Sequence, residues 1–154
     1  MSPVGISRVN TLGQVIYGNP RWMEMSGRGA DEEFPEEGLV DLVHPDDRRI
    51  MEELWKDALE NTKEVAFELR WGTLDRFLWI MGELVPEIVD EEVQYANSFM
   101  LTKHRGFIGV LTDVTERRHS ELARLAAVEE AHAQQELAIG SALILQLICR
   151  HNLP

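Results

Sequence analysis

TDVTERR, at Thr112 to Arg118, lies where an apolar segment gives way to a charged one. The residues just before it, Gly106 to Leu111, have the composition of a buried strand, because they include Phe, Ile, Val and Leu. The residues that follow, Glu116 to Glu136, contain no Pro or Gly, and this predicts one long helix. Such a junction ties the last strand of a domain to an outgoing helix. It is typical of a sensor or relay module.

Three residues form the predicted signal-relay junction. Asp113 and Glu116 have the spacing of a capping box, in which the Asp113 carboxylate accepts a free backbone N–H and Glu116 bonds back. Thr115 is the alternative cap, and it would move the start of the helix by two residues. In either case we expect this end of the helix to be fixed to the last strand.

Length and charge narrow the class of protein. A chain of 154 residues suits one domain with an extension, and it is long enough to bury a core without disulfides or metal. Its net charge of -12 argues against direct binding to nucleic acid or to an anionic membrane. The single cysteine, Cys149, and the lack of a signal peptide favour a reducing compartment. The apolar run from Leu137 to Cys149 is shorter than the roughly 20 residues of a membrane span, so we expect a soluble, cytoplasmic protein.

Local patterns predict an α+β fold, with an antiparallel sheet and short helices packed on one face. Strands are expected at Val4–Val9, Gln14–Tyr17, Glu64–Trp71, Phe77–Val85 and Gly106–Leu111. Helices are expected at Pro20–Met25, from the His44-Pro45 turn to about Glu60, and from Glu116 onward. Pro86 to Arg105 is interpreted as a long, partly acidic connection. Residues 1–115 then form a domain, 116–136 a connector helix, and 137–154 an apolar tail whose role the sequence does not indicate.

Five groups of residues occur in the order and spacing of one known family. They are Asn10-x-x-Gly13-x-Val-Ile-Tyr-x-Asn19-Pro20, Ser26-Gly27, Leu42-Val-His-Pro-Asp-Asp-Arg48, Phe67-x-x-Arg70 with Trp79, and Gly109-x-x-x-Asp113-Val-Thr115. On these residues, the segment from Val4 to Arg118 resembles a PAS domain. The resemblance implies a five-stranded antiparallel sheet cupped by short helices. One departure is that Gly72-Thr-Leu-Asp75 stands where the family often has an Asp-Gly turn.

The resemblance implies a sensory or signal-relay function. TDVTERR followed by a helix rich in Glu, Ala and Gln is similar to PAS domains that lie just upstream of histidine kinase modules. The implied partners are a second copy of the chain, in a homodimer, and a downstream kinase or output domain. The alternative is a ligand-free PAS-fold module that acts only in protein–protein association or dimerisation. A third interpretation is that His151 is a phosphoacceptor. The alternative is that His151 is an incidental histidine in a frayed C-terminal tail.

Nine large apolar residues are candidates for lining a ligand pocket between sheet and helices. Either they line a cavity for a small apolar ligand, or they fill it as a packed core. They are Trp22, Met25, Phe34, Leu42, Leu54, Trp55, Phe67, Trp79 and Leu111.

We expect no catalytic residues, metal or cofactor in this chain. It has no His-x-x-x-His or Gly-x-Ser-x-Gly motif, and its histidines are scattered. A flavin-adduct photoreceptor of the resembled family would need a reactive Cys after Asn19-Pro20, whereas Cys149 is far downstream. His44 is interpreted as a helix-start residue whose ring hydrogen-bonds backbone, with haem ligation as the alternative.

The strand expected at Phe77–Val85 is apolar on both faces, although the helices of such a fold cover only one. This predicts self-association through the outer face of the sheet together with the outgoing helix.

Overall fold

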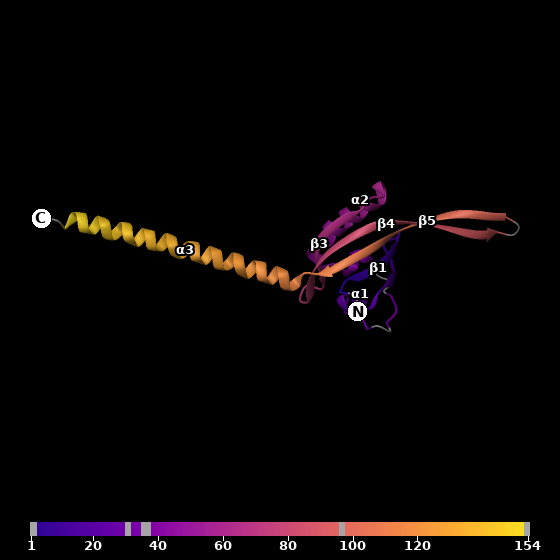
Figure 1. Cartoon of the computed structure of the whole chain (residues 1–154), viewed down its shortest axis with the longest axis horizontal. Helices are drawn as coiled ribbons and strands as arrows, with labels where there is room; N and C mark the ends of the chain where they lie inside the picture. Colours follow the sequence, from indigo (N-terminus) through magenta and orange to yellow (C-terminus); the bar gives the residue numbers. More distant parts are fainter. Residues whose placement is uncertain (1–2, 30–31, 35–37, 96–97, 153–154) are drawn as a thin grey trace. The chain divides into compact units, whose positions relative to one another are not determined.

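The computed structural model describes residues 3–29, 32–34, 38–95 and 98–152 (Figure 1). They divide into two compact units, Met1–Thr115 and Glu116–Pro154. The first unit is a five-stranded antiparallel sheet of order β2-β1-β5-β4-β3, and this confirms the predicted α+β fold. The strands are β1 (Gly5–Asn10), β2 (Val15–Gly18), β3 (Val65–Gly72), β4 (Phe77–Tyr95) and β5 (Ser98–Asp113). The helices are α1 (Pro20–Met25), the 3-10 turns η1 (Leu39–Leu42) and η2 (Pro45–Asp47), α2 (Arg48–Asn61) and α3 (Thr115–His151).

Asn19 starts α1 and attaches it to the sheet. Its side-chain Oδ1 accepts the backbone N–H of Trp22 at 2.9 Å, which is the expected N-cap bond. The same oxygen accepts the N–H of Ile6 on β1 at 3.0 Å. One amide side chain therefore fixes the first helix against a central strand.

The hairpin between β3 and β4 forms without an Asp-Gly turn. The two strands pair in register from Val65↔Leu84 to Gly72↔Phe77. The loop between them closes because the N–H of Thr73 donates to the carbonyl of Arg76 at 2.9 Å. Gly72 has φ +132, and a Cβ there would lie 2.3 Å from the Arg76 carbonyl oxygen. Only glycine fits this position, so it takes the role of the usual turn residues.

The segment Pro86–Arg105 is not the loose connection that its acidic composition suggested. Instead β4 and β5 continue as a two-stranded hairpin, paired as far as Tyr95↔Ser98 (Figure 1). In such a ribbon each strand bonds the other through its backbone, so the fold needs no apolar side chains there. Acidic residues such as Glu91 and Glu92 are therefore compatible with strand as well as with loop.

The core lies between the helices and one face of the sheet. Inward positions alternate along the strands, and α2 contributes Met51 and Ala58, both fully buried. Gly82 on β4 gives space to the ring of Phe67, since a Cβ at Gly82 would lie 2.4 Å from the ring. Trp55 packs edge-on against Phe107 with ring centroids 5.0 Å apart. The helices and the sheet are thus joined by large side chains that interlock.

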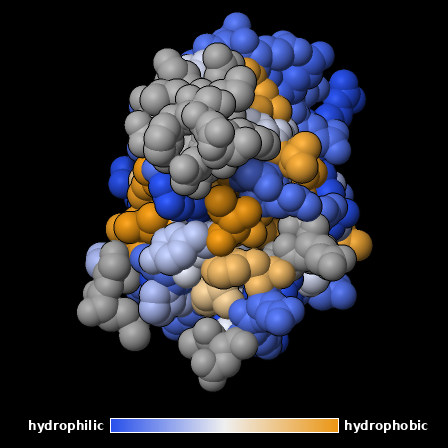
Figure 2. Space-filling model, turned by 90° about the vertical axis from the view of Figure 1, so that its right-hand side faces the viewer, coloured by the Kyte–Doolittle hydropathy of each residue, from blue (hydrophilic) through white to orange (hydrophobic). Residues whose placement is uncertain are grey.

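The opposite face of the sheet keeps apolar side chains at its surface. They form what we call the outer patch, which consists of Ile6, Tyr17, Met81, Ile108 and Val110. Ile6 is 39% exposed and lies opposite Val110, while Met81 is 44% exposed. Figure 2 shows one end of the molecule, where hydrophobic side chains are exposed between hydrophilic ones.

The second unit is a helix that is longer than predicted. The expected helix Glu116–Glu136 continues through the segment that was interpreted as an apolar tail, and it ends at His151. Ala, Leu and Gln in this segment favour helix, and the one interrupting glycine, Gly140, costs only about 1 kcal/mol. None of the described residues of α3 is buried.

We expect Gly82→Ala to destabilise the first unit by about 1–3 kcal/mol, because the added methyl group collides with the Phe67 ring. Gly140→Ala is the matched control, since a Cβ there meets nothing within 4 Å. It should leave the unfolding transition of the first unit unchanged and raise the helicity of α3. Urea denaturation followed by tryptophan fluorescence measures the first effect. Equal midpoints for Gly82→Ala and the wild type would contradict this, because they would show that the Phe67 ring can take another position without loss of stability.

Candidate functional site

Asp47 and Arg70 form a close ion pair between the start of α2 and the strand β3. The Asp47 carboxylate accepts three bonds from Arg70, which come from the backbone N–H at 2.9 Å, Nε at 3.0 Å and Nη2 at 2.7 Å. Asp47 is buried and Arg70 is partly buried. Bonding to Arg70 lowers the pKa of the Asp47 carboxyl, so the pair stays ionised at neutral pH.

Aromatic rings surround the Arg70 guanidinium. Its Cζ lies 5.7 Å from the ring centroids of both Phe77 and Trp79, a distance that allows cation–π attraction. His44 packs edge-on against Phe77 at 5.1 Å. Its Nδ1 accepts the N–H of Asp46 at 3.2 Å, the backbone bond expected of a helix-start residue. We call His44, Asp47, Arg70, Phe77 and Trp79 the arginine cluster.

The predicted relay junction is hydrogen-bonded to β4 at Trp79. The Thr115 hydroxyl accepts the backbone N–H of Trp79 at 2.9 Å, and the N–H of Val114 donates to the Trp79 carbonyl at 2.8 Å. The Asp113 carboxylate accepts the N–H of Thr115, also at 2.9 Å. Glu116, the third predicted member, is exposed. Trp79 therefore belongs to the arginine cluster through its ring and to the junction through its backbone.

A groove of about 640 Å³ opens where β3 turns into β4, and we call it the hairpin groove. Its walls come from the end of α1, from η1, from the start of α2 and from the β3–β4 hairpin. The lining residues are Glu24, Met25, Ser26, Gly27, Asp41, Leu42, Arg48, Trp71, Gly72, Thr73, Arg76, Phe77 and Leu78. Phe77 is shared with the arginine cluster, so the groove adjoins the contacts that lead to Thr115.

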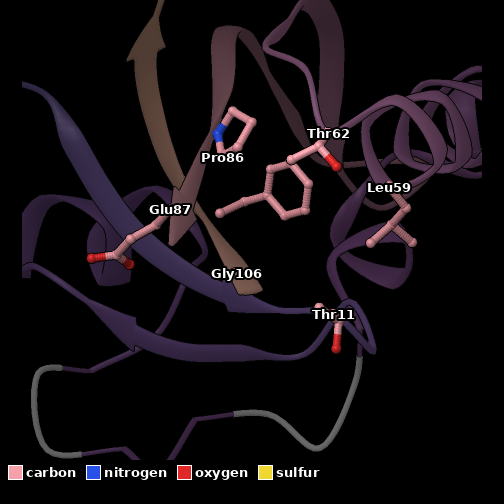
Figure 3. Close-up of a pocket in the computed structure, with 7 residues that line it drawn as sticks. Thr11, Leu59, Thr62, Pro86, Glu87 and Gly106 are labelled. Atoms are coloured by element: carbon pink, nitrogen blue, oxygen red, sulfur yellow. The ribbon is translucent and has the colours of Figure 1, made fainter. Parts of the chain in front are cut away.

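A second, much smaller pocket lies near the other end of α2. Figure 3 shows Thr11, Leu59, Thr62, Pro86 and Glu87 around it. Its volume is about 20 Å³, which holds roughly one water molecule. It is too small for an organic ligand.

The nine predicted pocket residues do not gather around one cavity. Trp22, Met25, Leu42, Phe67 and Leu111 are buried in the core, and Leu54 and Trp55 pack against it. Phe34 is 37% exposed, with its ring 6.3 Å from that of Trp22. Trp79 lies among the outward positions of β4, beside Arg70. Only Met25 and Leu42 of the nine line the hairpin groove.

Sequence patterns missed most residues of the groove and the role of Arg70. Arg70 and Asp47 both occur in the motifs used above, but nothing in their spacing of 23 residues predicts that they pair. Trp71 and Arg76 gave no signal, because one belongs to an alternating strand and the other to a turn.

Within the described ranges, no three His, Cys, Asp or Glu side chains are grouped so as to hold a metal ion. Among the same residues, no helix has the length and apolar character required to cross a bilayer.

We expect Asp47→Asn to lower the free energy of unfolding at pH 7, and the loss to shrink in acid. A carboxyl with a lowered folded-state pKa stabilises fully above its unfolded-state pKa of about 3.9, and the contribution disappears as pH falls through the folded-state value. Urea denaturation of both proteins between pH 7 and about pH 2 measures the difference. Asp75→Asn, at an exposed loop carboxylate, is the control and should change little. A difference that stays constant into strong acid would contradict the ionic role of Asp47.

Comparison with known proteins relates the fold to one family. Residues 15–79 match the family model described as PAS fold. A sensory box histidine kinase/response regulator from Burkholderia thailandensis has a solved structure that is 26% identical, with a TM-score of 0.58, covering 84% of this chain and 91% of that one. The PAS domain of a protein from Colwellia psychrerythraea is 20% identical, with a TM-score of 0.53, over 75% of this chain and 89% of that one.

A longer relative is the uncharacterized protein y4lL of Sinorhizobium fredii. It is 30% identical over 132 residues, which make up 85% of this chain. The chain spans about 15% of the length of that relative.

Proposed function

Since this chain contains a PAS domain, we propose that it is the sensory and signal-relay region of a signalling protein of the histidine kinase type. In this proposal, binding of a ligand or partner changes the sheet, and the change reaches the outgoing helix α3 at Thr115. The partner that receives the signal is a downstream kinase or output domain. The likeness to the sensory box histidine kinase from Burkholderia thailandensis supports this choice of output.

The observation that carries the proposal is the double role of Trp79. Its ring packs on Arg70, which is held by Asp47, and its backbone holds Thr115. A shift of β4 at Trp79 therefore changes the hydrogen bond between the backbone N–H of Trp79 and the hydroxyl of Thr115, the last residue of the first unit. The contacts are short and directional, so a small displacement is enough to weaken them.

We expect Thr115→Val to loosen the start of α3. The change removes the acceptor of the partly buried Trp79 N–H and should cost about 1 kcal/mol. Hydrogen exchange should then be faster across Glu116–Ala131 than in the wild type, with the sheet less affected. Thr115→Ser is the matched control, because it keeps the hydroxyl. Unchanged exchange in that segment for Thr115→Val would remove the physical basis of the relay.

The proposal includes a homodimer, because two groups of described residues expose apolar side chains. The outer patch is one of them. The other is the segment Leu137–Cys149 of α3, where Leu143, Ile144 and Leu145 are all more than half exposed. A helical segment that is apolar on every side is normally buried against other helices. Two-fold pairing with a second copy is the commonest way for a chain to bury such surfaces.

We expect the full chain to sediment as a dimer at tens of micromolar. Met81→Glu places a charge in the outer patch and should weaken the dimer, and so should deletion of all residues after Arg118. Leu12→Glu is the control, because Leu12 is also apolar and exposed but lies in the β1–β2 turn. A wild-type chain that remains monomeric at this concentration would contradict the pairing.

The same exposed surfaces favour a second candidate, a ligand-free module that acts only in association. Native mass spectrometry of freshly purified protein separates the two functions. A sensory module that copurifies with its ligand carries added mass on each chain, whereas an association module shows the bare dimer and binds no added small molecule.

A further inference from the structure

Two residues that line the hairpin groove each carry a buried polar atom that has no hydrogen-bond partner within the described part of the chain. They are the hydroxyl oxygen of Ser26 and the indole Nε1 of Trp71. Trp71 is 2% exposed, and a buried indole N–H nearly always has an acceptor. The missing acceptor is therefore a feature to explain, and a molecule bound in the groove would supply it.

The charges around the groove are unequally matched. Of its two carboxylates, Glu24 is paired with Arg21 at 2.7 Å, and Asp41 accepts the N–H of Gly38 at 3.0 Å. Arg48 donates to two backbone carbonyls, those of Val43 and Asp41, so its charge, like that of Asp41, has no opposite charge paired with it among the described residues.

The second arginine of the groove is Arg76, in the β3–β4 loop. Its side chain is exposed and pairs with no carboxylate among the residues that the structure describes. With Glu24 neutralised by Arg21, the two arginines Arg48 and Arg76 face only one further carboxylate, Asp41, so the groove keeps one positive charge in excess, although the whole chain carries a net charge of -12. A negatively charged group is complementary to this one place.

Most of the remaining lining is apolar. Met25 and Leu42 are buried at the groove wall, and Phe77 and Leu78 complete it from β4. A volume of about 640 Å³ is in the range of small-molecule sites. The groove thus joins an apolar wall to unmatched hydrogen-bond donors and positive charge.

We propose that the hairpin groove binds a small organic carboxylate. The apolar body of the ligand packs on Met25 and Leu42, and its carboxylate accepts from Trp71 Nε1 and from the Arg76 guanidinium. A neutral amide or alcohol would meet the hydrogen-bonding need of Trp71 but not the charge of the arginines. This inference rests on the proposed sensory function and names the ligand class that the groove would detect.

The test uses the full chain with its four tryptophans labelled with 15N at the indole nitrogen. The probe is 4-phenylbutyrate, and 4-phenylbutyramide is its neutral counterpart. We expect the carboxylate to shift one indole signal saturably, and that signal to be absent from Trp71→Phe. The amide should bind about tenfold more weakly, because it lacks a charge-assisted bond.

Two arginine variants make the test specific. Arg76→Gln should weaken binding of the carboxylate about tenfold and leave binding of the amide nearly unchanged. Arg49→Gln is the matched control, since Arg49 is exposed on α2 and pairs with Glu53 away from the groove. It should bind both probes as the wild type does. These variants keep the test valid even if Trp71→Phe does not fold.

Equal affinity for the carboxylate and the amide would overturn the proposal. So would an unmoved Trp71 signal at saturating probe, or equal losses in Arg76→Gln and Arg49→Gln. Failure here is distinguishable from failure of the relay, which the Thr115→Val exchange experiment measures without any ligand. If α3 loosens in that variant while no carboxylate binds, the ligand class is wrong and the relay stands.

Discussion

The bond between the Asp47 carboxylate and the Arg70 guanidinium holds the helical layer to the edge of the sheet. β3 is one of the two edge strands of the sheet, and its outer edge would otherwise expose unpaired backbone groups. The segment around η2 covers that edge, since the N–H of His44 donates to the carbonyl of Arg70 and Val43 bridges to Trp71. With η2 fixed there, α2 begins in the position that directs its apolar side toward the core.

Most of the fold could be predicted from sequence because its signals are local. Asn19-Pro20 marked the start of α1, and the alternation of Val65, Phe67 and Leu69 marked β3, since each pattern reflects contacts within a few residues. Composition failed where it had two structural meanings. The acidic residues after Pro86 suggested a loop but lie in a paired hairpin, and the apolar residues after Leu137 suggested a separate tail but continue a helix.

The candidate site was much less predictable, because it depends on which distant segments meet. Apolar character identified Trp22 and Phe67 as interior residues, but it could not show that they fill the core rather than line a cavity. The groove is assembled from three separate parts of the chain, and its polar members became visible only once burial and missing partners were known. Trp79 was placed with the pocket, although the alternation of β4 puts it on the other face.

The order of strands in the sheet also has a consequence for how the chain folds as it is synthesised. β3, β4 and β5 follow one another in sequence and pair as neighbours, whereas β1 pairs with β5 across almost the whole first unit, Gly5 opposite Leu111. Closing that distance costs more entropy than pairing strands that are neighbours in sequence, so we expect the three-stranded meander to form before the N-terminal hairpin joins it. Trp79 lies in β4 and Thr115 directly follows β5, so their hydrogen bond can form before β1 pairs with β5. The N-terminal hairpin is then the part that can detach in partial unfolding while α3 keeps its anchor.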